Sequence, residues 1–188
     1  RDGQRVVYQY DMQGNLLKAA GAEGTTSYTY NAFNQQTAVL TADGGKLENQ
    51  YDAEYLRAET IENGEKRTFL YYNGELLAEA DQEEEPVSRY ILGYGVAAYR
   101  NRGKEGYHSC HQDEQNSTVY LLGADGRSKR LPVRCFWSDP NEPGRASNRI
   151  LYTRQQYDQI SSQYYLRARY YNPVVGRFLQ EDVYRGDG

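Results

Sequence analysis

The chain has few of the residues that mark specialised domain classes. Its 188 residues include two cysteines, Cys110 and Cys135, far below the density of a disulfide scaffold, and whether they pair stays open. Lys and Arg total 22 against 26 Asp and Glu, so the net charge of −4 gives no basic field for nucleic-acid phosphates. No apolar run approaches the roughly 18 residues that span a bilayer. We expect neither nucleic acid nor a membrane span.

Sequence signatures of cofactor chemistry are also missing. No glycine-rich strand-to-helix turn and no Gly-x-Ser-x-Gly elbow is present, so no cofactor is expected. Two His and two Cys would make a tetrahedral zinc site in principle. The spacing of His108, Cys110, His111 and Cys135 is unlike the usual paired motifs, so no metal site is predicted.

Tyrosine is abundant instead, with 20 residues, and part of it is periodic. Tyr10, Tyr30, Tyr51 and Tyr72 recur at intervals of 20, 21 and 21 residues, each followed by Asp or Asn. A fixed period near twenty residues predicts small supersecondary units that bury their apolar faces by stacking on their neighbours. Tyrosine rings supply contact area with which stacked repeat units can pack into a wall. They also suit carbohydrate or partner binding.

Each unit is typical of a strand, a turn and a second strand. In the first, Tyr10 ends an alternating segment, Asp11 can bond the backbone two residues on, and Gly14 tolerates the positive φ that closes the turn. The later turns are centred on Asn31, Asp52, and Asn73 with Gly74. In the third, Tyr55 occupies the Gly position, which predicts strain unless the loop is re-routed.

The chain therefore predicts an all-β fold: serial hairpins forming a curved strip, with Tyr, Thr and Gln on its inner face. Residues 81–86 are expected to form a charged, solvated loop. Residues 131–148 hold three of the five prolines and indicate an irregular insertion. We expect one continuous body, with hairpin repeats over 1–92 and a second segment over 93–188.

These residues resemble the RHS/YD-repeat proteins, which include polymorphic toxins, insecticidal toxin complex C components and wall-associated proteins. The Tyr-Asp units match the YD repeat, and residues 111–118 are similar to a His-x-Asp-x-x-Gly-Ser/Thr segment with Asn116 in the Gly position. The most specific similarity is to the RHS-associated core signature over residues 163–182. Its marker residues here are Tyr170, Tyr171, Pro173, Gly176, Arg177 and Phe178.

The resemblance implies that the repeats wind into a hollow shell around a C-terminal effector polypeptide, which an aspartyl autoprotease releases. It places a catalytic carboxylate at Asp182, with Asp187 as its candidate partner and Arg177 as a charge-balancing residue. Paired carboxylates that share a proton are the physical requirement of that chemistry. The same residues also suit a turn with an ordinary salt bridge, and Asp182-Val183 departs from the family's Asp-Pro.

We therefore expect an encapsulation module of a secreted or cell-surface bacterial toxin, cut from a longer exported protein. Its protease would act in the full-length parent and is expected to be inactive in this fragment. The alternative is a cell-surface adhesion or recognition module without protease activity. Expected partners are the effector, the rest of the shell, or a second copy joined through open strand edges.

Overall fold

The computed structural model describes residues 5–103, 106–123, 125–130 and 149–181. Over these residues the chain forms two antiparallel sheets, one of 13 strands and one of four. The large sheet is a meander in which each strand pairs with the next along the chain. This confirms the expected all-β strip.

The large sheet contains short strands of three to eight residues. They are β1 (Val7–Tyr10), β2 (Leu16–Gly21), β3 (Gly24–Tyr30), β4 (Gln36–Leu40), β5 (Lys46–Tyr51), β6 (Arg57–Glu62), β7 (Glu65–Tyr72), β8 (Glu75–Ala80), β9 (Pro86–Gly93), β10 (Gly95–Asn101), β11 (His108–Gln112), β12 (Thr118–Leu122) and β13 (Ser128–Arg130). The sheet crosses the expected boundary at 92/93 without a break, and the division of the chain there stays a prediction. Residues 131–148 lie outside the described part.

One turn geometry recurs along the strip. Asp11 Oδ1 accepts hydrogen bonds from the backbone N–H groups of Gln13 and Asn15, at 2.9 and 2.8 Å. Equivalent caps are made by Asn31, Asp52, Asp81 and Asp113. The fourth residue is left-handed in every one of these five turns: Gly14, Asn34, Tyr55, Glu84 and Asn116. The charged 81–86 segment is thus a regular repeat turn.

The Asp52 turn was expected to be strained at Tyr55 unless the loop re-routed, and the loop is not re-routed. Tyr55 adopts a φ of 63° and keeps the backbone bonds of the other turns, with its N–H donated to the Asp52 carbonyl at 3.1 Å. The two side-chain bonds of Asp52 hold the turn against the cost of a left-handed Tyr. The fourth unit closes differently, as a two-residue Asn73-Gly74 turn between Tyr72 and Glu75.

Repeat tyrosines tie each unit to the one before it. Tyr30, Tyr51 and Tyr71 donate their hydroxyls to the carbonyls of Leu16, Gln36 and Arg57, at 3.0, 2.7 and 2.9 Å. Each acceptor is the first residue of β2, β4 or β6. The register shifts by one residue just before each of these tyrosines. The fourth repeat tyrosine is therefore Tyr71; Tyr72 flanks the turn and is 63% exposed.

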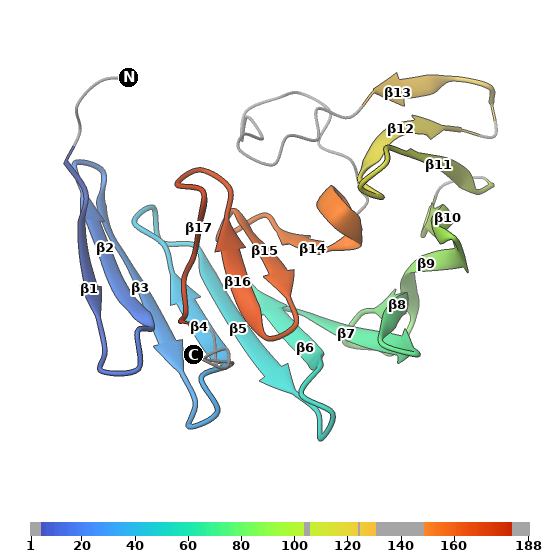
Figure 1. Cartoon of the computed structure of the whole chain (residues 1–188). Helices are drawn as coiled ribbons and strands as arrows, with labels where there is room; N and C mark the ends of the chain where they lie inside the picture. The colour runs from blue at the N-terminus through green and yellow to red at the C-terminus, as the bar shows by residue number, and fades with distance from the viewer. Residues whose placement is uncertain (1–4, 104–105, 124, 131–148, 182–188) are drawn as a thin grey trace, which may run out of the picture.

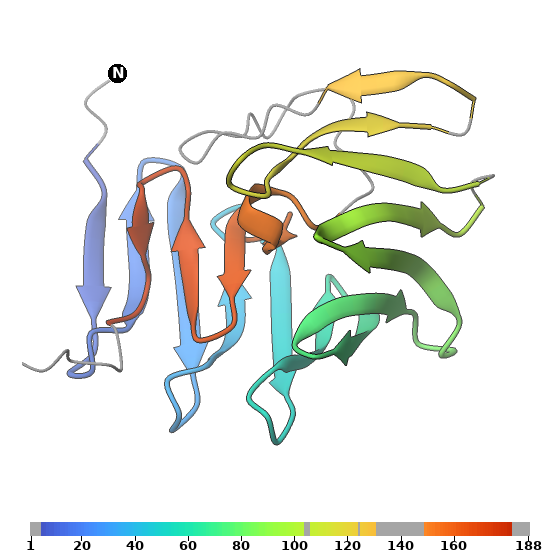
Figure 2. The ribbon, with the colours of Figure 1, turned by 45° about the vertical axis from the view of Figure 1, so that its right-hand side comes forward.

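The strip bends into an arc, and residues 149–181 lie inside it (Figures 1 and 2). A short 3₁₀ turn, η1 (Tyr152–Arg154), leads into β14 (Gln156–Asp158), β15 (Gln163–Leu166), β16 (Arg169–Asn172) and β17 (Arg177–Phe178). Tyr28, Gln36 and Thr60, which are of the residue types expected on the inner face, are consequently buried. None of the described residues forms a helix that could cross a membrane.

Candidate functional site

The candidate functional site is the contact between the small sheet and the inner face of the strip. One apolar cluster joins strip residues Leu16, Tyr28, Val39 and Leu47 to Tyr165, Tyr170 and Leu179 of the C-terminal part. A second gathers Phe69, Leu76, Tyr90, Val96, Tyr99 and Leu121 around Ile150. Between them lies a cluster of charges that joins the two sheets.

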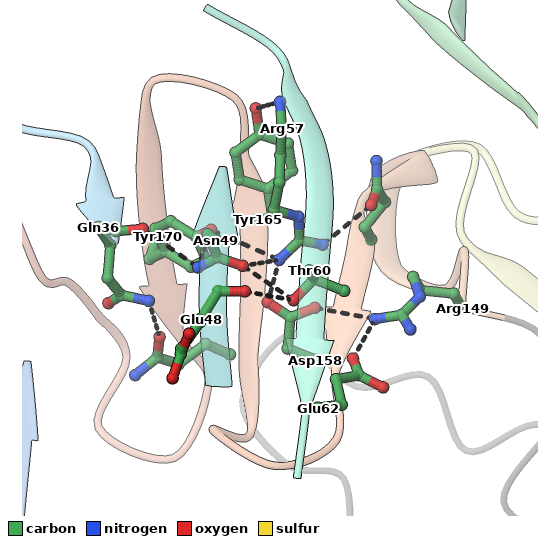
Figure 3. Close-up of polar contacts among 12 residues, drawn as sticks. Gln36, Glu48, Asn49, Arg57, Thr60, Glu62, Arg149, Asp158, Tyr165 and Tyr170 are labelled. Atoms are coloured by element: carbon green, nitrogen blue, oxygen red, sulfur yellow. Dashed lines mark hydrogen bonds and ion pairs between the residues drawn. The ribbon is translucent and has the colours of Figure 1, made fainter. Parts of the chain in front are cut away.

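Arg57 is the centre of this ionic cluster, and its side chain has no exposed surface. Its Nη1 bonds the Asp158 carboxylate of β14, and Nη2 donates to Gln156 Oε1 at 2.9 Å (Figure 3). The guanidinium also lies over the ring of Tyr165, 4.6 Å from its centroid. One strip side chain is thereby held by three residues of the small sheet.

Arg149 makes the reciprocal connection from the C-terminal part to the strip. Its guanidinium contacts Glu62 of β6 at 2.7 Å and Glu79 of β8 at 3.3 Å, and Asp158 at 3.0 Å. Asp158, fully buried, thus lies between the two arginines. Three carboxylates surround two cations, which compensates charges that would be very costly to bury alone.

Burial opposes ionisation in this cluster, and the opposite charges outweigh it. Burial disfavours the cation of Arg57, but Asp158 beside it raises the Arg57 pKa well above its usual range. Burial likewise works against the Glu62 carboxylate, yet Arg149 lowers the Glu62 pKa below its ordinary value of 4.5. Burial and the neighbouring Glu79 raise the pKa of Tyr90, whose hydroxyl donates to Glu79 at 2.6 Å. The shifts favour a charged Arg57, a charged Glu62 and a neutral Tyr90, as their contacts require.

Hydrogen bonds among neutral groups extend the cluster toward β4 and β5. Asn49 Nδ2 donates to the Tyr170 hydroxyl at 3.1 Å (Figure 3). The Tyr51 and Tyr170 hydroxyls lie 3.0 Å apart. Gln36 Nε2 donates to Gln163 Oε1 at 3.3 Å. Together these contacts fix the C-terminal sheet on the strip.

The core-signature residues form the last part of this attached sheet. Tyr170 is buried, and its N–H donates to Gln180 Oε1 at 2.8 Å. Pro173 is buried, Tyr171 is half-buried against the ring of Phe178, and Gly176 has the left-handed φ of 69° that its turn requires. Most of the signature is therefore explained by folding and docking of β15 to β17.

The predicted catalytic residues are only partly placed. Arg177 is on β17 and exposed, whereas Asp182 and Asp187 lie outside the described residues. The last described residue, Glu181, packs on the Gly14 turn so closely that a Cβ at Gly14 would lie 2.8 Å from that of Glu181. The Leu16 N–H also donates to the Leu179 carbonyl at 2.8 Å. The described part of the chain thus ends, at Glu181, beside the first repeat turn.

The His and Cys residues do not gather into a ligand set within the described ranges, where no group of three or more His, Cys, Asp or Glu is suited to a metal ion. His108 stacks on Tyr99, with ring centroids 5.3 Å apart. Burial raises the pKa of the Cys110 thiol to about 12. Cys135 lies outside the described residues, and so does any pairing with Cys110.

Sequence reasoning missed the ionic cluster because its partners are far apart in the chain. Arg57 and Asp158 are separated by 101 positions. The repeat register did carry a signal for Arg57: it is the first residue after its turn, the position of Leu16 and Gln36, both of which are buried. An arginine at an inward position requires a buried anionic partner.

Comparison with known proteins identifies the strip. Residues 10–46 match the sequence model of the RHS repeat. The same Asx-capped turn and tyrosine bond continue beyond that range to Tyr71 and Asp113. Residues 10–46 of this chain therefore carry RHS-repeat sequence.

Known RHS relatives are much longer than this chain. The tRNA3(Ser)-specific nuclease WapA of Bacillus spizizenii is 27% identical over 183 residues, which cover 92% of this chain and 8% of WapA. A chain of the Photorhabdus luminescens Tc holotoxin pore with a TccC3 mutation superposes with a TM-score of 0.62 at 14% identity, over 94% of this chain and 12% of that one. TcdB2-TccC3 without its hypervariable C-terminal region gives a TM-score of 0.60 at 14% identity, over 96% and 12%. The chain thus has the fold of one section of these larger toxin chains.

Proposed function

We propose that this chain is a wall section of an RHS toxin, whose curved strip helps to enclose an effector polypeptide. The observation that carries the proposal is the attachment of residues 149–181 inside the arc by Arg57, Arg149 and their carboxylates. A polypeptide joined after this sheet would begin on the inner side of the strip. Similarity to WapA nucleases and to TccC3, a protein with a hypervariable C-terminal region, supports this role. Such a toxin would act after export or at the bacterial surface.

We further propose that Asp182 takes part in autoproteolytic release of that polypeptide, with Asp187 as the second carboxylate and Arg177 balancing their charge. The support is chemical: two neighbouring carboxylates can share one proton, so that one activates water while the other stays ionised. The exposed position of Arg177 on β17 leaves its guanidinium accessible to a carboxylate.

The test uses a parent chain that continues past Gly188, expressed with its downstream polypeptide and followed by gel electrophoresis and mass spectrometry. Wild type is expected to yield a separate downstream fragment that resists added protease until the shell is denatured. Asp182→Asn should abolish the cut, while Asp125→Asn, in an exposed turn, should leave it intact. Undiminished cleavage in Asp182→Asn would remove this residue from the mechanism. A parent without cleavage or protection would instead favour a surface-recognition module.

A further inference from the structure

A hollow of about 360 Å³ lies between the Asn31 turn and the Asp52 turn of the strip. Both turns are on the lower side of the strip in Figure 2. The hollow extends over the start of β4 and the end of β5, which are neighbouring strands of the sheet. Its volume is at the low end of the range of about 300 to 1,000 Å³ that is usual for small-molecule sites. We call it the turn pocket.

Two aromatic side chains line the turn pocket. Phe33 of the Asn31 turn and Tyr55 of the Asp52 turn meet edge to face, with ring centroids 5.7 Å apart. They remain 66 and 58% exposed, so their contact leaves ring surface free. Among the five Asx-capped turns of the described chain, only these two contain an aromatic residue. The aromatic surface of the turns is therefore gathered at this pocket.

Tyr55 occupies its position at a conformational cost. Its φ of 63° is left-handed, where two of the other turns have Gly14 and Asn34, residues that adopt this conformation with less strain. The two hydrogen bonds accepted by Asp52 close the turn without any contribution from the ring. A strained residue whose side chain is not needed for the turn indicates a role outside folding.

The rest of the pocket offers hydrogen-bonding groups that are not in use. The Gln50 amide and the Thr37 hydroxyl have no partner among the described residues. Gln35 accepts a bond from Asn31 through Oε1 at 2.7 Å, and within the same ranges its Nε2 has no acceptor. Asp52 closes its turn through Oδ1 alone, so its Oδ2 is an available acceptor. Donors and acceptors thus lie beside the two rings.

We propose that the turn pocket binds a neutral saccharide. A sugar ring presents C–H groups that pack on aromatic rings, and hydroxyl groups that bond amides and carboxylates. The turn pocket supplies both kinds of group. The inference is independent of the proposed enclosure, because no residue of the C-terminal sheet lines this pocket.

The same residues argue against other classes of ligand. Asp52 and Glu54 place negative charge at the turn, and none of the described residues that line the pocket is Lys or Arg, so phosphates and acidic sugars would be repelled. An extended peptide would need a free strand edge, whereas β4 and β5 are each paired on both sides. Four of the ten lining residues carry amide side chains, which disfavours an apolar ligand. A neutral polyhydroxylated ligand meets all three conditions.

Saturation-transfer difference NMR of the 188-residue chain tests the proposal. The probes are neutral trisaccharides of glucose, mannose, galactose and N-acetylglucosamine, and an acidic trisaccharide of galacturonic acid. At least one neutral trisaccharide is expected to receive saturation, most strongly at its ring C–H protons, and the acidic one is not. The proposal is overturned if no neutral trisaccharide receives saturation, or if the acidic one receives as much.

Variants then assign the binding to the turn pocket by isothermal titration calorimetry. Tyr55→Asn relieves the left-handed strain while removing the ring, so it should keep the turn and raise the Kd about tenfold or more. The matched control is Tyr72→Asn: Tyr72 is 63% exposed and flanks another turn, but it does not line the pocket. This control should leave the Kd unchanged. Equal losses in the two variants would overturn the assignment.

A second variant tests the polar side of the pocket. Asp52→Asn keeps a capping side chain of the kind that closes the Asn31 turn, but it replaces the available carboxylate acceptor by an amide, so it should also raise the Kd. Far-ultraviolet circular dichroism would show that the variants keep their strands. Decaproline is the competing ligand, because proline-rich peptides also dock on aromatic side chains. Binding of decaproline that is lost in Tyr55→Asn, without binding of any trisaccharide, would overturn the proposal in favour of a peptide site.

Discussion

The strip and the C-terminal sheet reach the same antiparallel structure from different kinds of contact. In the strip, each strand pairs with its sequence neighbour, and each repeat tyrosine bonds a carbonyl 14 or 15 positions back. The small sheet is held in place by residues about 100 positions away, through Arg57, Asp158 and Arg149. The strip is thus specified locally, whereas the position of the small sheet depends on a few buried, distant pairs.

Removing Arg57 should give the largest loss of stability, because Arg57 holds the small sheet on the strip. Arg57→Ala leaves Asp158 buried with only part of its compensation, so we expect the free energy of unfolding to fall by about 3 to 5 kcal/mol in urea titrations. Arg127→Ala removes an exposed contact with Asp125 and should cost less than about 0.5 kcal/mol. A double variant, Arg57→Met with Asp158→Leu, should recover much of the loss. Equal losses for both single variants would contradict a special role for the cluster.

Acidification should loosen the same attachment by another route. Arg149 lowers the Glu62 pKa in the folded state, so ionised Glu62 contributes stability above its ordinary value of 4.5, and that contribution is lost as the pH falls through the folded pKa. Urea titrations at successive pH values below 4.5 should therefore show decreasing stability. Glu62→Gln should be less stable at neutral pH and flatter in this acid range. A variant whose profile stays parallel to that of wild type would contradict the linkage.

The smallest effect is expected inside the strip. Tyr30→Phe removes the hydroxyl that bonds the Leu16 carbonyl and should lower the free energy of unfolding by about 1 kcal/mol. Tyr72→Phe is the control, because Tyr72 is mostly exposed and Tyr71 makes the equivalent bond. If Tyr72→Phe cost as much as Tyr30→Phe, the assignment of the repeat tyrosine to position 71 would be wrong.

Local features of the strip could be predicted from the sequence, whereas the long-range contacts of the small sheet could not. Asp11, Asn31 and Asp52 predicted their turns, since an Asx side chain acts within four residues. The fourth tyrosine was misplaced by one position because Tyr71 and Tyr72 are adjacent and a register shift precedes Tyr71. The Tyr, Thr and Gln residues of the inner face were predicted, as Tyr28, Gln36 and Thr60 show. The docking of the C-terminal sheet on that face and the ionic cluster were not predictable, because their partners come together only through tertiary folding. Asp182 and Asp187 stay predictions based on the core signature.

The Asx-capped turn has a consequence for how such chains diverge. Two side-chain hydrogen bonds from its first residue fix the loop, and the left-handed fourth position accepts Gly, Asn, Tyr or Glu. Substitutions at this fourth position change the sequence motif but leave the turn geometry intact. Geometry should accordingly outlast sequence similarity among distant relatives, and searches for such units would gain from scoring the capping residue and the strand spacing above the glycine.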